Sequence, residues 1–159
     1  MSELKNNKVL KAAMVFITIL LGGGVVFLAM SLYGSITDYI SGKQDSGFMY
    51  AAFSALGIIF AYLMYLLRSI TKSALNRQPF TMNNVKSFRK IGATLLAISF
   101  IDIILNYGKS SGTRIIDINS VFIVTPDTLL IMILSCIAFV LAEVFRAAVE
   151  IKNENDLTI

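Results

Sequence analysis

The chain has 159 residues, of which 56% are apolar and only 15% are charged. A soluble domain of this length has too little interior to bury so much apolar surface, so the composition argues against an ordinary soluble protein and for a lipid environment. The sequence contains no histidine and one cysteine, Cys136, which excludes an intrachain disulfide, His-dependent serine chemistry and most zinc sites. With no glycine-rich phosphate loop either, we expect no enzyme activity and no cofactor.

Four apolar stretches of membrane-spanning length follow one another along the chain. They cover residues 12–33, 48–67, 91–107 and 129–145. A helix needs about 20 apolar residues to cross the hydrocarbon core, and the first stretch is longer than a signal-peptide core, so we expect it to stay uncleaved. The stretches are continuous rather than alternating, which favours helices over a barrel. The sequence therefore predicts an all-α, integral membrane bundle of four transmembrane helices, forming one domain over residues 1–159.

The distribution of basic residues predicts the orientation of these helices. The N-terminus, the segment 68–90 and the tail 146–159 contain most of the lysines and arginines, whereas the other two loops contain only Lys43, Lys109 and Arg114. Short loops rich in lysine and arginine stay in the cytoplasm and meet anionic lipid headgroups. We therefore expect a multi-pass protein of the bacterial cell membrane, with both termini, the loop 68–90 and the tail on the cytoplasmic side.

Two segments carry the signals of a helix start. Thr81 can cap free amide groups of a following turn, which predicts that the third helix begins near Met82, in the cytoplasm. Thr125 and Pro126 predict a second start, because proline suits the first helical position. Before it, the β-branched run of residues 115–121 predicts a short extracellular strand or hairpin in the loop between the third and fourth helices.

Asp102 is the one acidic residue well inside a predicted span, and Ser99 and Asn106 share its helix face. A charge at this depth is costly, so it must be protonated, paired or hydrated. One interpretation is a proton or cation site. The other, which we favour because a single acid makes a poor relay, is a structural hydrogen-bonding network or a link toward Lys109 or Arg114.

Charged and small residues also predict contacts between the helices. Glu143 and Arg146 stand three residues apart near the inner end of the fourth helix, which predicts an ion pair, shared with Arg68 or Arg89. Small residues recur within the spans and permit close helix approach. We expect them to pack this chain's own bundle rather than a dedicated dimer, although a homo-oligomer stays open. They include Gly22-Gly23-Gly24, Gly57 with Ala61, Ala93 with Ala97, and Ala138 with Ala142.

Two motifs carry a resemblance to a known family. The first contains Pro79-Phe80-Thr81, Asn84 and Arg89-Lys90-Ile91-Gly92, and the second contains Leu141–Arg146, Glu150 and Glu154–Ile159. Together they resemble the bacterial integral membrane family catalogued as domain of unknown function 2975. Members are often encoded beside a small helix-turn-helix transcription regulator, so the resemblance implies a cytoplasmic regulator as partner. The chain itself has no DNA-reading element, and we expect no direct binding of nucleic acid.

The leading hypothesis is a non-enzymatic membrane protein whose cytoplasmic face binds or restrains such a regulator. An alternative is self-protection against a membrane-active peptide through the outer loops 34–47 and 108–127, and a further one is a small transport component using Asp102. Neighbouring genes distinguish these, because a peptide precursor with an exporter favours immunity. The acidic tail is also expected to dock on the basic loop. The expected interaction residues are Arg68, Arg77, Pro79, Phe80, Thr81, Asn84, Arg89, Lys90, Glu143, Arg146, Glu150 and Glu154.

Overall fold

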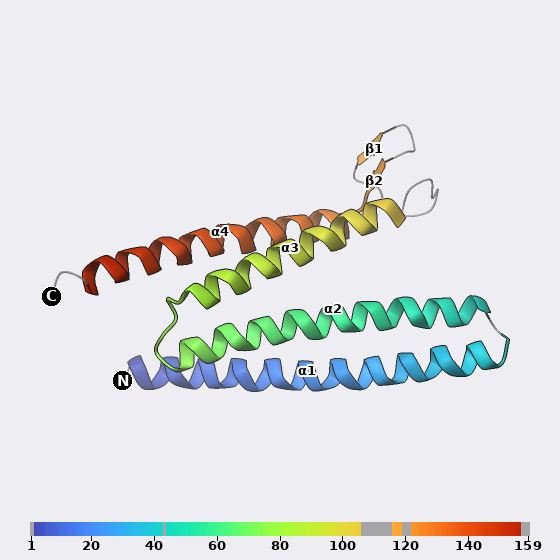
Figure 1. Cartoon of the computed structure of the whole chain (residues 1–159), viewed down its shortest axis with the longest axis horizontal. Helices are drawn as coiled ribbons and strands as arrows, with labels where there is room; N and C mark the ends of the chain where they lie inside the picture. The colour runs from blue at the N-terminus through green and yellow to red at the C-terminus, as the bar shows by residue number, and fades with distance from the viewer. Residues whose placement is uncertain (1, 43, 106–115, 119–121, 157–159) are drawn as a thin grey trace. The chain divides into compact units, whose positions relative to one another are not determined.

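The computed structural model of the chain describes residues 2–42, 44–105, 116–118 and 122–156. Its elements are four long helices and two short strands (Figure 1), namely α1 (Ser2–Ile40), α2 (Gln44–Leu75), α3 (Met82–Leu105), β1 (Ile116–Ile118), β2 (Phe122–Val124) and α4 (Pro126–Asp156). The strands form an antiparallel pair in which Asp117 faces Ile123. The prediction of an all-α chain with four helices is confirmed.

The chain divides into two compact units, Met1–Pro79 and Phe80–Ile159. In the first unit α1 packs along α2, and in the second α3 packs along α4, so that each unit is a helical hairpin (Figure 1). The second hairpin also holds the two-stranded sheet, between α3 and α4 in the chain. Each hairpin pairs two helices that follow one another in the chain; residues 41–43 connect α1 to α2, whereas the longer segment 106–125 connects α3 to α4.

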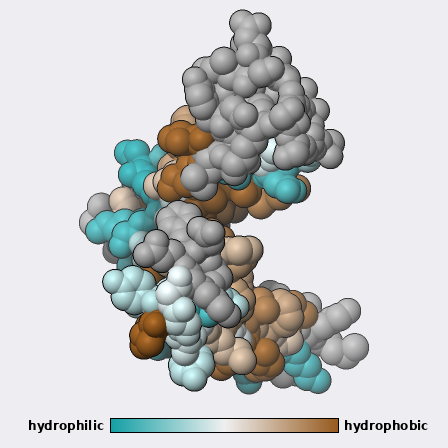
Figure 2. Space-filling view, turned by 90° about the vertical axis from the view of Figure 1, so that its right-hand side faces the viewer, coloured by the Kyte–Doolittle hydropathy of each residue, from teal (hydrophilic) through white to brown (hydrophobic). Residues whose placement is uncertain are grey.

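Among the described residues, three helices are long and apolar enough to cross a membrane, and they contain the stretches Lys8–Ile40, Met49–Leu75 and Pro126–Asn155. Their large apolar side chains are mostly exposed; Met30, for example, is 70% exposed and Ile58 58%. The end-on view in Figure 2 likewise shows hydrophobic side chains, in brown, at the surface. Exposing this much apolar surface is unfavourable in water but not in lipid. These helices indicate a multi-pass membrane protein.

The predicted third span stands apart from these three. Its helix, α3, carries Arg89, Lys90 and Asp102 within the part that the structure describes. The last two residues of the predicted span, 106 and 107, lie outside the described residues.

The helices extend well beyond the apolar stretches. Only residues 76–81 separate α2 from α3, so most of the predicted loop 68–90 is helical, and α4 continues through the predicted tail as far as Asp156. Hydropathy marks where lipid contact ends, whereas intrahelical hydrogen bonds continue into water. Lysine, arginine and glutamate are also good helix formers, so nothing in these segments stops a helix early.

The end of α2 is set by a backbone motif. Arg77 has a φ of 58°, in the left-handed region, and its amide donates to the carbonyl of Ala74 at 3.1 Å. The amide of Gln78 donates to the carbonyl of Ser73, also at 3.1 Å. These two bonds form a Schellman motif, which satisfies carbonyl groups at the helix end.

Both predicted helix starts are confirmed. The Thr81 Oγ1 accepts the backbone amide of Asn84 at 3.3 Å, and α3 begins at the next residue after Thr81. The Thr125 Oγ1 accepts the amide of Thr128 at 3.3 Å, and α4 begins with Pro126. Each threonine thus caps the amide donors that a helix leaves free at its N-terminus.

The first hairpin packs around small residues. A Cβ atom at Gly57 would lie 3.4 Å from the Cβ and 3.7 Å from the Cα of Leu28, so α2 approaches the backbone of α1 closely there. A buried hydrogen bond of 3.0 Å joins the hydroxyls of Ser31 in α1 and Ser54 in α2. The contact at Gly57 agrees with packing within the chain's own helices. At Gly23, by contrast, a Cβ atom would meet nothing within 4 Å.

Candidate functional site

The interface between α3 and α4 is lined with small polar side chains. Ser87, Ser99, Thr128 and Ser135 are all buried. The Ser135 Oγ donates to the carbonyl of Gly92 across the two helices at 2.8 Å. Such bonds are characteristic of helix pairs in lipid, where hydroxyl groups find no water.

Asp102 lies at one end of this interface and has a partner on α4. The Thr128 hydroxyl donates to the Asp102 Oδ2, and the hydroxyls of Thr128 and Thr125 lie 2.8 Å apart. Ser99, predicted to accompany Asp102, donates instead to the backbone carbonyl of Leu96 at 2.7 Å. The structure therefore places Asp102 in a hydrogen-bonding network with Thr128, in the first turn of α4, and with Thr125, the residue that caps this helix.

Three residues predicted near Asp102, namely Asn106, Lys109 and Arg114, lie outside the described residues. Thr128 was not among the predicted residues. The signal that points to it is the predicted helix start at Thr125 and Pro126, because a capping threonine and the third residue of the following helix face each other.

The opposite end of the hairpin carries a cluster of alternating charges. The Arg89 Nη2 donates to the Glu143 Oε1 at 2.6 Å, and the Arg146 Nη1 lies 3.6 Å from the Glu143 Oε2. The Arg146 Nε donates to the Glu150 Oε1 at 3.0 Å. The predicted Glu143–Arg146 pair is thus confirmed, with Arg89 as its third member. We call these four residues the charge cluster.

The charge cluster stabilises the hairpin little in water, because all its side chains are about half exposed and such pairs contribute roughly 0–1 kcal/mol. Its effect is on geometry, since it fixes the direction of two arginines and two carboxylates on one side of the hairpin.

Aromatic side chains lie beside the charge cluster. The ring of Phe145 is 5.0 Å from that of Phe88 and 5.7 Å from that of Phe80, measured between ring centroids. Phe80 precedes α3 and remains 45% exposed. The end of the hairpin therefore presents both fixed charges and accessible apolar area, the combination found in protein interaction surfaces. We refer to the charge cluster with these three phenylalanines as the Arg89 end.

Comparison with known proteins identifies the family. The family model described as "Protein of unknown function (DUF2975)" matches residues 35–159. The chain belongs to this family. No curated protein and no solved structure matches it. The family match covers α2, α3 and α4 and includes both motifs that carried the resemblance.

The other predicted interaction residues of this DUF2975 protein are distributed over both units. Arg68 and Arg77 are exposed and belong to the first unit, Lys90 is exposed on α3, and Asn84 is fully buried in the first turns of α3. Glu154 is exposed in the last turns of α4. The structure therefore brings together Arg89, Glu143, Arg146, Glu150 and Phe80, while the position of Asn84 suits packing rather than recognition.

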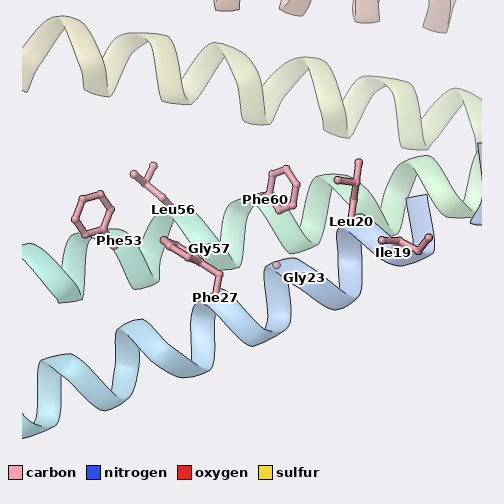
Figure 3. Close-up of a pocket in the computed structure, with 9 residues that line it drawn as sticks. Ile19, Leu20, Gly23, Phe27, Phe53, Leu56, Gly57 and Phe60 are labelled. Carbon is pink, nitrogen blue, oxygen red and sulfur yellow. The ribbon is translucent and has the colours of Figure 1, made fainter. Parts of the chain in front are cut away.

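A groove of about 530 Å³ lies between α1 and α2. Apolar residues of both helices line it (Figure 3), with Phe27 projecting from α1 and Phe53 and Phe60 from α2. Most of α1 lies before residue 35 and hence outside the match to DUF2975. In lipid such a groove takes up hydrocarbon, and it holds no group that could act in catalysis.

Proposed function

We propose that this DUF2975 protein is a non-enzymatic membrane protein whose Arg89 end binds a basic cytoplasmic protein. In this proposal α3 also crosses the membrane, so that the chain crosses it four times, and both chain termini lie in the cytoplasm of a bacterial cell. The observation that carries the proposal is the coincidence of fixed charges and exposed aromatic area at one end of the α3–α4 hairpin with the exposed carboxylates of Glu150 and Glu154 in the following turns of α4.

The positive-inside rule supports this orientation. Lys8 and Lys11 precede the apolar part of α1, and Lys72 lies in the last turn of α2. In the second hairpin Lys90 precedes the apolar part of α3, and Lys152 follows that of α4. Within each hairpin these residues lie at the end that the rule assigns to the cytoplasm.

The terminal turns of α4 supply a surface for a partner. From Arg146 to Asp156 the helix extends about 15 Å at 1.5 Å per residue, and it exposes Glu150 and Glu154. An acidic helix attracts a basic partner and orients it. A small helix-turn-helix regulator has the required positive charge, because it binds phosphates of DNA. Docking on α4 would hold such a regulator at the membrane and compete with DNA for its basic surface.

The two alternative functions have weaker support. Transport through Asp102 is disfavoured by its hydrogen bond with Thr128, which fits a structural role. Immunity through the outer loops has no support among the contacts of the described residues. Both alternatives stay predictions: the Asp102→Asn variant tests transport, and the identity of the neighbouring genes tests immunity.

Co-purification of the full chain from mild detergent with a small helix-turn-helix regulator encoded beside its gene tests the proposed function. Removing residues 150–159 should abolish recovery of the regulator, and Glu154→Lys should weaken binding roughly tenfold. Lys152→Glu is the matched control, because it reverses a charge in the same turns and makes the surface more acidic; binding should persist or strengthen. Unchanged binding after removal of residues 150–159 would defeat the proposed surface.

A further inference from the structure

The two hairpins differ in the length of helix that separates their charged residues. In α1 no charged residue lies between Lys11 and Asp38, which corresponds to about 40 Å at 1.5 Å per residue. In α2 none lies between Asp45 and Arg68, or about 35 Å. Both lengths exceed the hydrocarbon core of a bilayer, which is about 30 Å thick. The first hairpin therefore has enough apolar length to cross with some tilt.

The second hairpin is much shorter between its charges. Lys90 and Asp102 in α3 are separated by about 18 Å, and Asp127 and Glu143 in α4 by about 24 Å. The length of helix between charged residues in this hairpin is thus about 6–12 Å shorter than the hydrocarbon core, although α4 as a whole is long and apolar enough to cross. Tilting would widen the shortfall, because it reduces the projection of a helix along the bilayer normal.

Bonds within the hairpin engage the charged side chains at both ends of this stretch. At one end Asp102 has a short side chain and accepts a hydrogen bond from Thr128 on α4. At the other end Glu143 pairs with Arg89 and Arg146, so both long side chains are engaged within the hairpin. Asp102 and the charge cluster therefore mark the two ends of this stretch, and Lys90 beside the cluster has a long side chain that is able to reach outward.

We propose that the α3–α4 hairpin binds a locally thinned bilayer, in which headgroups and water of the outer leaflet reach the level of Asp102 and Thr128. A bilayer adapts to a short hydrophobic element by thinning around it, at a modest cost for each ångström. Hydration also removes the large cost of placing a carboxylate in hydrocarbon. This inference rests on the part of the proposed function in which α3 crosses the membrane, and not on the cytoplasmic partner.

Two exposed positions form a matched pair for the test. Ile104 lies as far beyond Lys90 in α3 as Val25 lies beyond Lys11 in α1, about 21 Å in each case. Their side chains are 69% and 51% exposed. In an unperturbed bilayer both would lie within hydrocarbon, whereas thinning places only Ile104 at the outer boundary. The two variants Ile104→Cys and Val25→Cys are made in a Cys136→Ser background.

Intact cells are treated with a membrane-impermeant maleimide. We expect Ile104→Cys to react at least roughly tenfold faster than Val25→Cys, because a thiol in hydrocarbon is shielded from the reagent. Equal protection of both positions would overturn the proposal. Ser41→Cys, in the exposed turn after α1, reports the orientation: if it fails to react, the proposed topology has failed rather than the thinning.

A further variant excludes a simple shift of the hairpin toward the outside. Lys86→Cys lies about one turn before Lys90 and is exposed. In inside-out vesicles it should react as fast as Arg77→Cys. Protection of position 86 would mean that the hairpin has slid outward by several ångströms, and it would contradict thinning.

Discussion

The Gly57→Leu variant is expected to lose about 1–3 kcal/mol of unfolding free energy in detergent, because its side chain has no room against α1. A Cβ at this position already lies in ordinary contact with the Cβ of Leu28 and only 3.7 Å from its Cα. The backbone of α1 cannot rotate away as a side chain would, so the two helices must separate. Unfolding by increasing sodium dodecyl sulfate measures the change.

Two variants control for effects other than packing. Gly57→Ala should be tolerated, because a methyl group at 3.4 Å fits without movement. Gly23→Leu introduces the same side chain as Gly57→Leu, at a position where a Cβ meets nothing within 4 Å. Both replacements of glycine by leucine gain similar helix propensity. The difference between their unfolding free energies therefore measures the cost of packing leucine against α1. Equal stability of Gly57→Leu and Gly23→Leu would show that α1 and α2 do not approach each other as described.

The Thr128→Val variant is expected to lose about 1–2 kcal/mol of unfolding free energy, because valine has the shape of threonine without its hydroxyl. The change removes the donor to Asp102 and the bond to the Thr125 hydroxyl. It leaves the part-buried carboxyl group without this donor, and loss of a partner at a part-buried group costs more than the bond itself contributes. Thr18→Val is the matched control, since the Thr18 hydroxyl donates to the carbonyl of Met14 in its own helix.

Combining Thr128→Val with Asp102→Leu tests whether the two side chains act together. The loss in the double variant should be smaller than the sum of the single losses, because the second change removes a group that already lacks its donor. If the two single losses of unfolding free energy add up in the double variant, Thr128 and Asp102 do not interact as described. The Asp102→Asn variant then distinguishes a structural role of Asp102 from a role in transport. If the stability of the variant persists but an ion- or proton-dependent phenotype disappears, the transport alternative replaces the structural role.

Features that depend on local sequence were predictable. The starts of α3 and α4 follow from Thr81 and Thr125, whose hydroxyls cap amides a few residues later. The Glu143–Arg146 pair follows from spacing within one helix. In each case the interacting groups are close in the chain, so helical geometry alone brings them together.

Contacts between helices were harder to predict. Asp102 meets Thr128 and Ser31 meets Ser54 because of the rotation and relative shift of each helix pair, which spacing in the sequence does not specify. A serine or threonine in an apolar helix has an equally satisfactory alternative, the carbonyl one turn earlier in its own helix. Ser99 takes that alternative, although its position in the sequence beside Asp102 favoured the other.

Cysteine labelling of intact cells tests the central claim, the orientation of the chain in the membrane, most directly. Single cysteines are placed by Arg77→Cys, Asn155→Cys and Ser41→Cys in a Cys136→Ser background, and the cells are exposed to a membrane-impermeant maleimide. We predict that Ser41→Cys reacts, while the other two react only after the cells are permeabilised. Reaction of position 77 or 155 in intact cells would place the basic segments outside and contradict both the topology and the proposed binding surface.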